Sequence, residues 1–231
     1  KHFRVSCVFA NDKQRNDLPG IEAVRDADLL LISVRRRVLP AGQMALIRAH
    51  VAQGKPVVGI RTANHAFHLR GKPAPQGHAL WEAWDAQVVG GNYSGHHGKN
   101  KRTWFQFEPT AKGHPILKGL QASEEISSGG SLYKVLPLSE TTELLAMGRA
   151  EGVEQKEPVA WTNKPTTGNR VFFTTLGHEG DFEKPEFRIM LLNAIHWALK
   201  REPPGKLKKP ASKKKKVTKK KKKTTKRSSK K

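Results

Sequence analysis

Two apolar runs with one helical pattern between them constrain the fold of this chain more than any other feature. Residues 29–34 and 56–60 are almost continuously apolar, which is typical of strands covered on both faces in a parallel sheet. Between them, Pro40 opens a predicted helix with apolar residues at helical spacing, and Gly54 ends it. Strand, helix and strand within about 32 residues form a βαβ unit, which predicts an α/β fold.

The rest of the body is expected to add more strands and three helical segments, without an internal repeat. A short helix or turn is predicted at 21–27, a helix at 79–89, and a strongly amphipathic helix at 185–200. Further strands are predicted at 4–9, 104–108, 129–135, 142–147, 158–162 and 170–175. We expect these elements to form one domain over residues 1–202.

The last 29 residues differ in kind from the body. Residues 203–231 hold 16 of the 43 Lys and Arg residues and none of the 20 acidic ones, so they supply most of the net charge of +23. They bury too little apolar surface to offset the entropy of ordering, which predicts a disordered tail. The tail would bind nucleic acid or another anionic surface through counterion release, without reading sequence. A purely solubilising role is the alternative.

Membrane and disulfide signals are weak or missing in the sequence. No stretch is apolar enough to predict a membrane span, and no signal-peptide pattern opens the chain. Because the chain starts at Lys1 and enters the apolar residues 3–10 almost at once, both a cytoplasmic and an exported location are compatible with it. Cys7 is the single cysteine, which excludes an intramolecular disulfide, and its apolar neighbours predict a core position.

Polar side chains directly follow several of the predicted strands. In open α/β sheets ligands bind beyond the carboxyl ends of parallel strands, so these positions are candidates for one shared site. Residues 92–99, rich in Gly and His, are expected to reach the same edge, because glycines permit close backbone approach to a ligand. The candidates for binding a substrate are Arg35, Arg37, Arg61, Asn64, Tyr93, His96 and His97.

The candidates for catalysis are His65, which follows residues 56–60, and His178 and Glu179, which follow residues 170–175. A histidine can move a proton near neutral pH while Arg61 and the loop histidines hold hydroxyl groups or a developing enolate. A divalent metal such as zinc is a candidate cofactor if side chains from the set His65, His96, His97 and His178 converge, although no short ligand spacing is present.

Each candidate also has a structural interpretation. The triplet Arg35, Arg36 and Arg37 could form a solvated rim, as charge runs usually do. His65 could be a packed, hydrogen-bonded histidine, and residues 92–99 could be a loose surface loop. A structure that brings these side chains together would favour the functional interpretation.

Five motifs occur together along the body. They are Gly-Lys-Pro-Val-Val-Gly-Ile-Arg-Thr-Ala-Asn-His-Ala-Phe at 54–67, Ser-Gly-His-His-Gly-Lys at 94–99, His-Pro-Ile-Leu at 114–117 with Gly119, Pro-Val-Ala-Trp at 158–161, and Phe-Phe-Thr-Thr-Leu-Gly-His at 172–178. This combination resembles the trehalose-utilisation (ThuA-like) family, in the family's order, over roughly residues 1–200. The resemblance implies a flavodoxin-like, class I glutamine-amidotransferase-like fold, with a mostly parallel sheet and helices on both faces. It also implies a role in carbohydrate catabolism.

The resemblance has two departures. Family members begin with a strand, a polar loop and a helix before the segment similar to residues 3–10, so we expect the domain to lack that first strand and helix. The amidotransferase relatives carry Gly-x-Cys-x-Gly at their nucleophile turn, where this chain has Arg61 for the cysteine and Ala63 for the second glycine. His178 and Glu179 fall near the positions of the triad partners. A guanidinium cannot attack a carbonyl, so amidotransferase activity is excluded.

Two functions from different classes remain at this point. The first is an enzyme, such as an isomerase or hydrolase, acting on trehalose, another disaccharide or a keto-sugar. The second is a non-catalytic module that binds a sugar-like small molecule and is tethered to polyanions by the basic tail.

Overall fold

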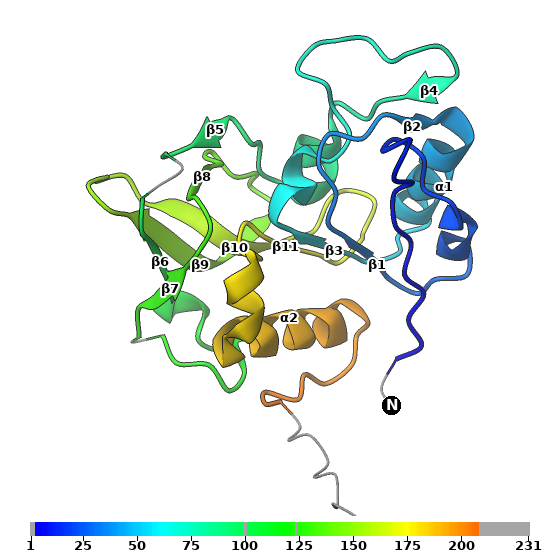
Figure 1. Cartoon of the computed structure of the whole chain (residues 1–231). Coiled ribbons are helices and arrows are strands. Elements are labelled where there is room, and N and C mark those ends of the chain that lie inside the picture. The colour runs from blue at the N-terminus through cyan, green and yellow to red at the C-terminus, as the bar shows by residue number, and fades with distance from the viewer. Residues whose placement is uncertain (1–2, 99–100, 123, 208–231) are drawn as a thin grey trace, which may run out of the picture.

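A seven-stranded sheet runs through the part of the chain that the computed structural model describes, residues 3–98, 101–122 and 124–207 (Figure 1). β1, β3 and β11 pair in parallel, whereas the other four pairs are antiparallel, so β10 and β6 run opposite to the other five strands. In sheet order the strands are β1 (Leu30–Ile32), β3 (Val57–Ile60), β11 (Val171–Thr174), β10 (Glu157–Asn163), β9 (Thr142–Ala150), β6 (Thr103–Phe107) and β7 (Ile126–Ser128).

Two small ribbons and several short helices complete the architecture. The helix α1 (Ala41–Ala52) joins β1 to β3, and α2 (Pro185–Ala198) follows β11. The ribbons are β2 (Leu39–Pro40) with β4 (His78–Ala79), and β5 (Gly95–His96) with β8 (Tyr133–Lys134). The short helices are η1 (Ile21–Val24), η2 (Arg61–His65), η3 (Asp85–Val89), η4 (Pro109–Ala111), η5 (Pro115–Leu117) and η6 (Glu179–Glu183).

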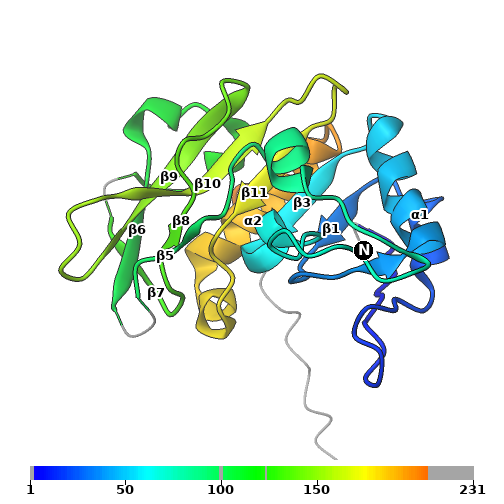
Figure 2. The same cartoon turned by 90° about the horizontal axis from the view of Figure 1, so that it is seen from above.

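The central strands are covered on both faces, as their apolar sequences require. Successive strand residues point to opposite faces, so Val57 packs in one apolar cluster with α1 while Val58 packs in another with α2. The side chains of β11 alternate in the same way, with Phe173 on the α1 side of the sheet and Phe172 on the α2 side. Figures 1 and 2 show α2 lying against one face of the sheet. The expected α/β fold, flavodoxin-like with helices on both faces, is confirmed.

The predicted strand at 4–9 is wrong. The segment has no strand pairing and runs past the β1 edge of the sheet (Figure 1). The side chains of Val5 and Phe9 are 73% and 78% exposed, and Cys7 is exposed as well, so the expected core position of the cysteine is also wrong. Apolar composition alone does not make a strand, because a strand also needs a neighbour for its backbone hydrogen bonds.

The predicted helix at 79–89 is replaced by β4, a turn and the short η3. The Trp81 amide donates to the Phe67 carbonyl at 2.9 Å, which takes this residue out of a helical hydrogen-bond pattern. Trp81 and Trp84 pack edge to face, with ring centroids 5.2 Å apart. Burial of these large rings therefore overrides the helical periodicity of the segment.

The end of the described chain packs against α2. The Gly205 amide donates to Asn193 Oδ1 at 3.0 Å, and Pro203 is buried. The predicted tail starts at residue 203, and all of it beyond residue 207 lies outside the described residues. No helix in the described ranges has the length and apolarity needed to cross a membrane.

Candidate functional site

The turn after β3 places Arg61 at the carboxyl end of the parallel strands. Arg61 has a left-handed backbone, φ 52°, which is uncommon for a residue with a side chain and costs roughly 1–2 kcal/mol. Two side-chain bonds hold the turn: Thr62 Oγ1 donates to the Val34 carbonyl at 3.1 Å, and Trp84 Nε1 donates to the Ala63 carbonyl at 2.7 Å. The surrounding structure thus fixes the direction in which the Arg61 side chain leaves the sheet.

Arg61 and His178 converge on one glycine pair. A methyl group added at Gly130 would overlap Arg61 Nη1, and one added at Gly129 would lie 2.5 Å from His178 Nδ1. The two side chains come from the ends of adjacent parallel strands, β3 and β11, while the glycines follow β7 at the far edge of the sheet. The structure therefore brings a cation and an imidazole together over a backbone that has no side chains to separate them.

The buried carboxylate of Asp181 holds this arrangement in place. Its Oδ2 accepts hydrogen bonds from Ser128 Oγ at 2.9 Å and from the amides of Gly177 and His178, both at 3.0 Å. Its Oδ1 accepts from the Gly129 amide at 3.3 Å. One side chain thus ties the loop after β7 to the turn after β11, and Asp181 positions the site residues without itself being exposed.

The Arg61 guanidinium has unused hydrogen-bonding capacity. Its Nη1 is buried and has no hydrogen-bond partner in the described part of the chain. Its carbon Cζ lies 5.5 Å from the centroid of the Tyr133 ring, within cation–π distance. A buried donor of this kind is costly unless a ligand oxygen completes it, so Arg61 is suited to binding a carbonyl or an oxyanion.

His65 is buried against Tyr93 and Tyr133, two rings that together form the aromatic wall of the site. Its ring stacks on Tyr93 with centroids 4.1 Å apart, and its Nδ1 is 2.7 Å from Asn64 Oδ1. Burial, followed by the charge of Arg36, lowers the pKa of His65 to about 3. The imidazole is therefore neutral at physiological pH and a poor base. This geometry favours a positioning role for His65 and Asn64 and leaves His178 as the better candidate for proton transfer.

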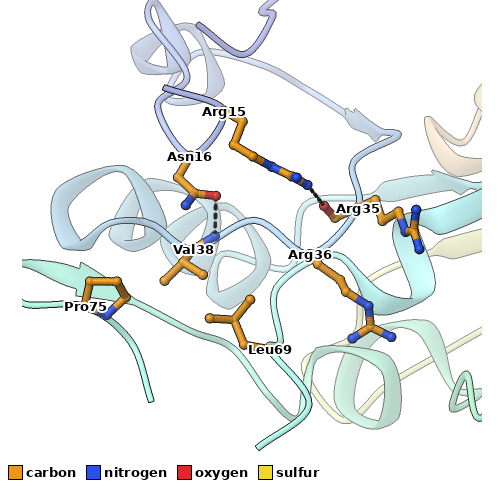
Figure 3. A pocket seen from close by; sticks show the side chains of 7 residues that line it. All are labelled: Arg15, Asn16, Arg35, Arg36, Val38, Leu69 and Pro75. Carbon is orange, nitrogen blue, oxygen red and sulfur yellow. Dashed lines mark hydrogen bonds between the residues drawn. The ribbon is translucent and has the colours of Figure 1, made fainter. Parts of the chain in front are cut away.

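Two cavities meet at Arg36, next to this aromatic wall. The larger one, of about 560 Å³, is lined by Arg36, His68, Arg70, Tyr93, Ser94, Gly95 and His96. The smaller one, of about 470 Å³, is lined by Arg15, Asn16, Arg35, Arg36, Val38, Leu69 and Pro75 (Figure 3). Neither is lined by Arg61 or His178, but Tyr93 contacts Tyr133 with ring centroids 4.9 Å apart, so the larger cavity adjoins the Arg61 group.

The other arginines of the triplet are held mainly through backbone oxygens. Arg37 Nη1 donates to the Arg35 carbonyl at 3.1 Å, and Arg15 approaches the same carbonyl in Figure 3. Burial lowers the pKa values of both Arg36 and Arg37. Arg35 lines the smaller cavity, whereas Arg37 lines neither.

The candidate histidines do not gather around one point. His97 Nε2 lies 2.9 Å from Oε1 of the fully buried Glu157, which gives His97 a structural partner away from both cavities. His96 lines the larger cavity, and Glu179 is exposed at the start of η6. Within the described ranges, no three His, Cys, Asp or Glu side chains form a group suited to a metal ion.

Sequence reasoning missed Tyr133, the Gly129–Gly130 pair and Arg70. The glycine pair was visible in the sequence as two adjacent glycines within a predicted strand, which is a signal for close backbone approach. Arg70 follows no predicted strand, so the rule that selects residues at strand ends does not identify it.

Several solved structures of other proteins are similar to this chain. A putative ThuA-like protein of Bacteroides uniformis has a similar structure, with a TM-score of 0.59 and 16% identity over 80% of this chain and 75% of that one. A ThuA-like protein of Parabacteroides merdae matches with a TM-score of 0.48 and 18% identity over 80% and 74% of the two chains. Agd3, a carbohydrate deacetylase, matches with a TM-score of 0.45 and 15% identity over 70% of this chain and 22% of that one.

No curated protein matches the sequence. The model of the ThuA family, described as trehalose utilisation, matches residues 3–198, which is most of the body. With the fold and the family model in agreement, the chain belongs to the ThuA family.

Proposed function

We propose that the protein is an enzyme of the metabolism of trehalose or another disaccharide, and that it transfers a proton on a sugar that carries a carbonyl group, such as a keto-sugar derived from one. The observation that carries the proposal is the convergence of Arg61 and His178 on Gly129 and Gly130, with Arg61 Nη1 buried and lacking an acceptor among the described residues. The family's description, trehalose utilisation, supports a sugar as the substrate class.

The two side chains have complementary roles in this reaction. The Arg61 guanidinium is permanently charged and would hold a carbonyl oxygen, stabilising the negative charge that develops on it as a neighbouring carbon loses its proton. His178 is exposed and can exchange its proton with solvent. It would take the proton from the carbon beside the carbonyl and return it to the carbonyl carbon, while the neighbouring hydroxyl proton passes to the former carbonyl oxygen. The result is an isomerisation that needs no external reductant or oxidant.

The experiment is a substrate screen with matched histidine variants. Trehalose, other disaccharides and their 3-keto derivatives are incubated with the protein, and turnover is followed by deuterium uptake from solvent. We expect His178→Ala to lower turnover by about 10²- to 10⁴-fold, as for a proton-transfer residue, with little change in the unfolding midpoint. His78→Ala, which removes a histidine of the β2–β4 ribbon that lines neither cavity, should leave turnover unchanged.

Arg61→Lys separates binding from proton transfer. A lysine keeps the charge but not the planar pair of donors, so ligand affinity should fall while exchange at saturating sugar falls less. Equal turnover by the wild type and His178→Ala would contradict the proposal.

A non-catalytic binding module is the second candidate. It is favoured by the presence of Arg61 where the amidotransferase relatives carry their nucleophile, because a cation can hold a ligand without reacting with it. Sugar binding that depends on Arg61, without deuterium uptake by any substrate, would establish this alternative.

A further inference from the structure

Two arginines that line the larger cavity, Arg36 and Arg70, have strained backbones, as Arg61 does. Four non-glycine residues in the described part of the chain have positive φ: Arg36 at 48°, Arg61 at 52°, Arg70 at 56° and Lys200 at 57°. Three of these are arginines at the candidate site. Strained backbone persists only where the surrounding structure enforces it, and it is frequent at ligand-binding positions.

The arginines around the two cavities form no salt bridge in the described part of the chain, although the charge of Asp85 acts on Arg36 from beyond salt-bridge distance. The salt bridges of the described residues involve none of Arg15, Arg35, Arg36, Arg37 and Arg70. Among the described residues, the side chain of Arg36 hydrogen-bonds to His68 alone, with Nη1 3.2 Å from Nδ1 and 3.5 Å from the backbone oxygen. Such an excess of unpaired positive charge attracts an anion.

The wall of the larger cavity also contains polar atoms without partners. Arg36 Nε, His68 Nε2 and His96 Nδ1 are buried and make no hydrogen bond in the part of the chain that is described. Asp85 Oδ2 lies 3.9 Å from His68 Nε2, too far for a hydrogen bond, and Asp85 does not line the cavity. Buried polar groups normally have partners, so these atoms indicate a missing ligand group.

We propose that the substrate is an anionic sugar whose phosphate or carboxylate group binds to Arg36 and Arg70 in the larger cavity. This inference rests on the proposed carbohydrate function and narrows its substrate class. Guanidinium groups match the planar oxygen pairs of a carboxylate or phosphate, which makes arginine the residue of choice for such a contact. Tyr93 lines the cavity and contacts Tyr133, and the Tyr133 ring lies within cation–π distance of Arg61. These two rings therefore connect the proposed anion site with Arg61.

The test is calorimetric titration of the full chain with matched sugars. The probes are trehalose, trehalose 6-phosphate, glucose, glucose 6-phosphate and glucuronate, with inorganic phosphate as a control. We expect each anionic sugar to bind at least tenfold more tightly than its neutral counterpart. The phosphate and glucuronate arms show which oxyanion the site prefers. A neutral sugar that binds as tightly as its anionic form would overturn the inference.

Glycine substitutions separate binding from folding. Because Arg36 and Arg70 have left-handed backbones, Arg36→Gly and Arg70→Gly remove the guanidinium while relieving strain, so the unfolding midpoint should not fall. Each should weaken anionic-sugar binding about ten- to a hundredfold, as expected for a charge-assisted hydrogen bond, and leave neutral-sugar affinity unchanged.

The matched control is Arg188→Gln, on the exposed face of α2. It lowers the net charge by the same amount and shares the basic tail, so binding of anions to the tail would affect all variants alike. Affinity that is equally strong in Arg36→Gly, Arg70→Gly and Arg188→Gln would place the anion on the tail and overturn the inference.

The results also separate this inference from the proposed function. Turnover of a sugar, together with anionic-sugar affinity that survives both Arg36→Gly and Arg70→Gly, would sustain the proposed function and refute the anion site. Binding of inorganic phosphate in an Arg36-dependent manner, with no sugar bound, would sustain an anion site but refute both its sugar ligand and the proposed function.

Discussion

Arg61 Nη1 occupies the space into which a side chain at Gly130 would project. Neither Gly129 nor Gly130 has a positive φ, so their role is to leave room for Arg61 and His178 and not to form an unusual turn. The site is therefore sensitive to the size of residues that perform no chemistry.

Gly130→Ala should displace the Arg61 guanidinium and reduce sugar turnover by roughly a hundredfold, since misplacement of a positioning group by about 1 Å has effects of this size. Its cost in stability should be small, because the overlapping atoms are the end of a flexible side chain. Gly180→Ala in the neighbouring η6 adds a methyl group with no atom within 4 Å and is the control. Turnover assays and thermal unfolding of both variants test the prediction, and equal activity would refute it.

Asp181→Asn should weaken the link between the β7 and β11 loops. The amide oxygen of the asparagine can take the place of Oδ2, but its NH2 group then faces the Gly129 amide. The partly buried Gly129 amide loses its acceptor, at a cost of about 1 kcal/mol. Chemical denaturation measures this loss. We also expect slower turnover with an unchanged pH profile, because Asp181 positions His178 and does not exchange protons with the substrate. A shifted pH profile would argue against that role.

His97→Ala should destabilise the protein without abolishing ligand binding. Its ring is the partner of a buried carboxylate, Glu157, and removing one member of a buried pair typically costs about 3 kcal/mol. Glu157 keeps the Val135 amide, at 3.1 Å, and Gln155 as hydrogen-bond donors, which limits the loss. Denaturation and calorimetry on the same variant separate the two effects. Loss of sugar affinity with unchanged stability would instead assign His97 to the ligand.

The stability of the wild type should fall between pH 6 and pH 4, because burial lowers the pKa of His50, His65, His68 and His114, and the raised pKa of Asp85 offsets only part of the loss. The pKa of His65 is lowered to about 3, so the folded state loses stability as pH falls below about 6.5, where only the unfolded chain gains this proton. Burial raises the pKa of Asp85 to about 6, so the folded state gains stability as pH falls from 6 toward 4.

Asp85→Asn removes one of these opposing effects. The variant should lose stability between pH 6 and pH 4 more steeply than the wild type, by up to about 1.4 kcal/mol per pH unit. Denaturant unfolding at several pH values measures the slope. Parallel curves for the two proteins would show that Asp85 titrates normally.

Truncation after residue 207 should leave the unfolding midpoint nearly unchanged, because the cut preserves the bond between Gly205 and Asn193. It removes 15 of the 43 basic residues, so salt-sensitive binding to DNA should be lost. A mobility shift at two salt concentrations tests this. DNA affinity that survives the truncation would indicate a nucleic-acid site on the body.

The sequence predicts the parts of the fold that depend on local pattern. The βαβ unit is present as β1, α1 and β3, and the helix predicted at 185–200 is α2 at Pro185–Ala198, because continuous apolar runs and helical periodicity are set by nearby residues. The conformations of residues 4–9 and 79–89 depend on distant parts of the chain. Residues 4–9 have no neighbouring strand to pair with, and in residues 79–89 the Trp81 amide bonds to the Phe67 carbonyl.

The candidate site shows the same difference between what local sequence predicts and what depends on distant contacts. The rule that ligands bind beyond strand ends identified Arg61 and His178, which do meet. It could not show that His65 would be buried behind Tyr93 or that His97 would face Glu157, because both contacts join segments far apart in the chain.

The bond between Gly205 and Asn193 determines where any tether would start. Asn193 lies on α2, so the described chain ends beside that helix, whereas Arg36, which lines both cavities, follows β1. An acidic polymer bound to the tail and a small sugar bound in the cavity would then occupy separate sites. The protein could stay anchored to a charged matrix while its pocket remains free to load and release substrate, and raising the salt concentration would detach the anchor before it emptied the pocket.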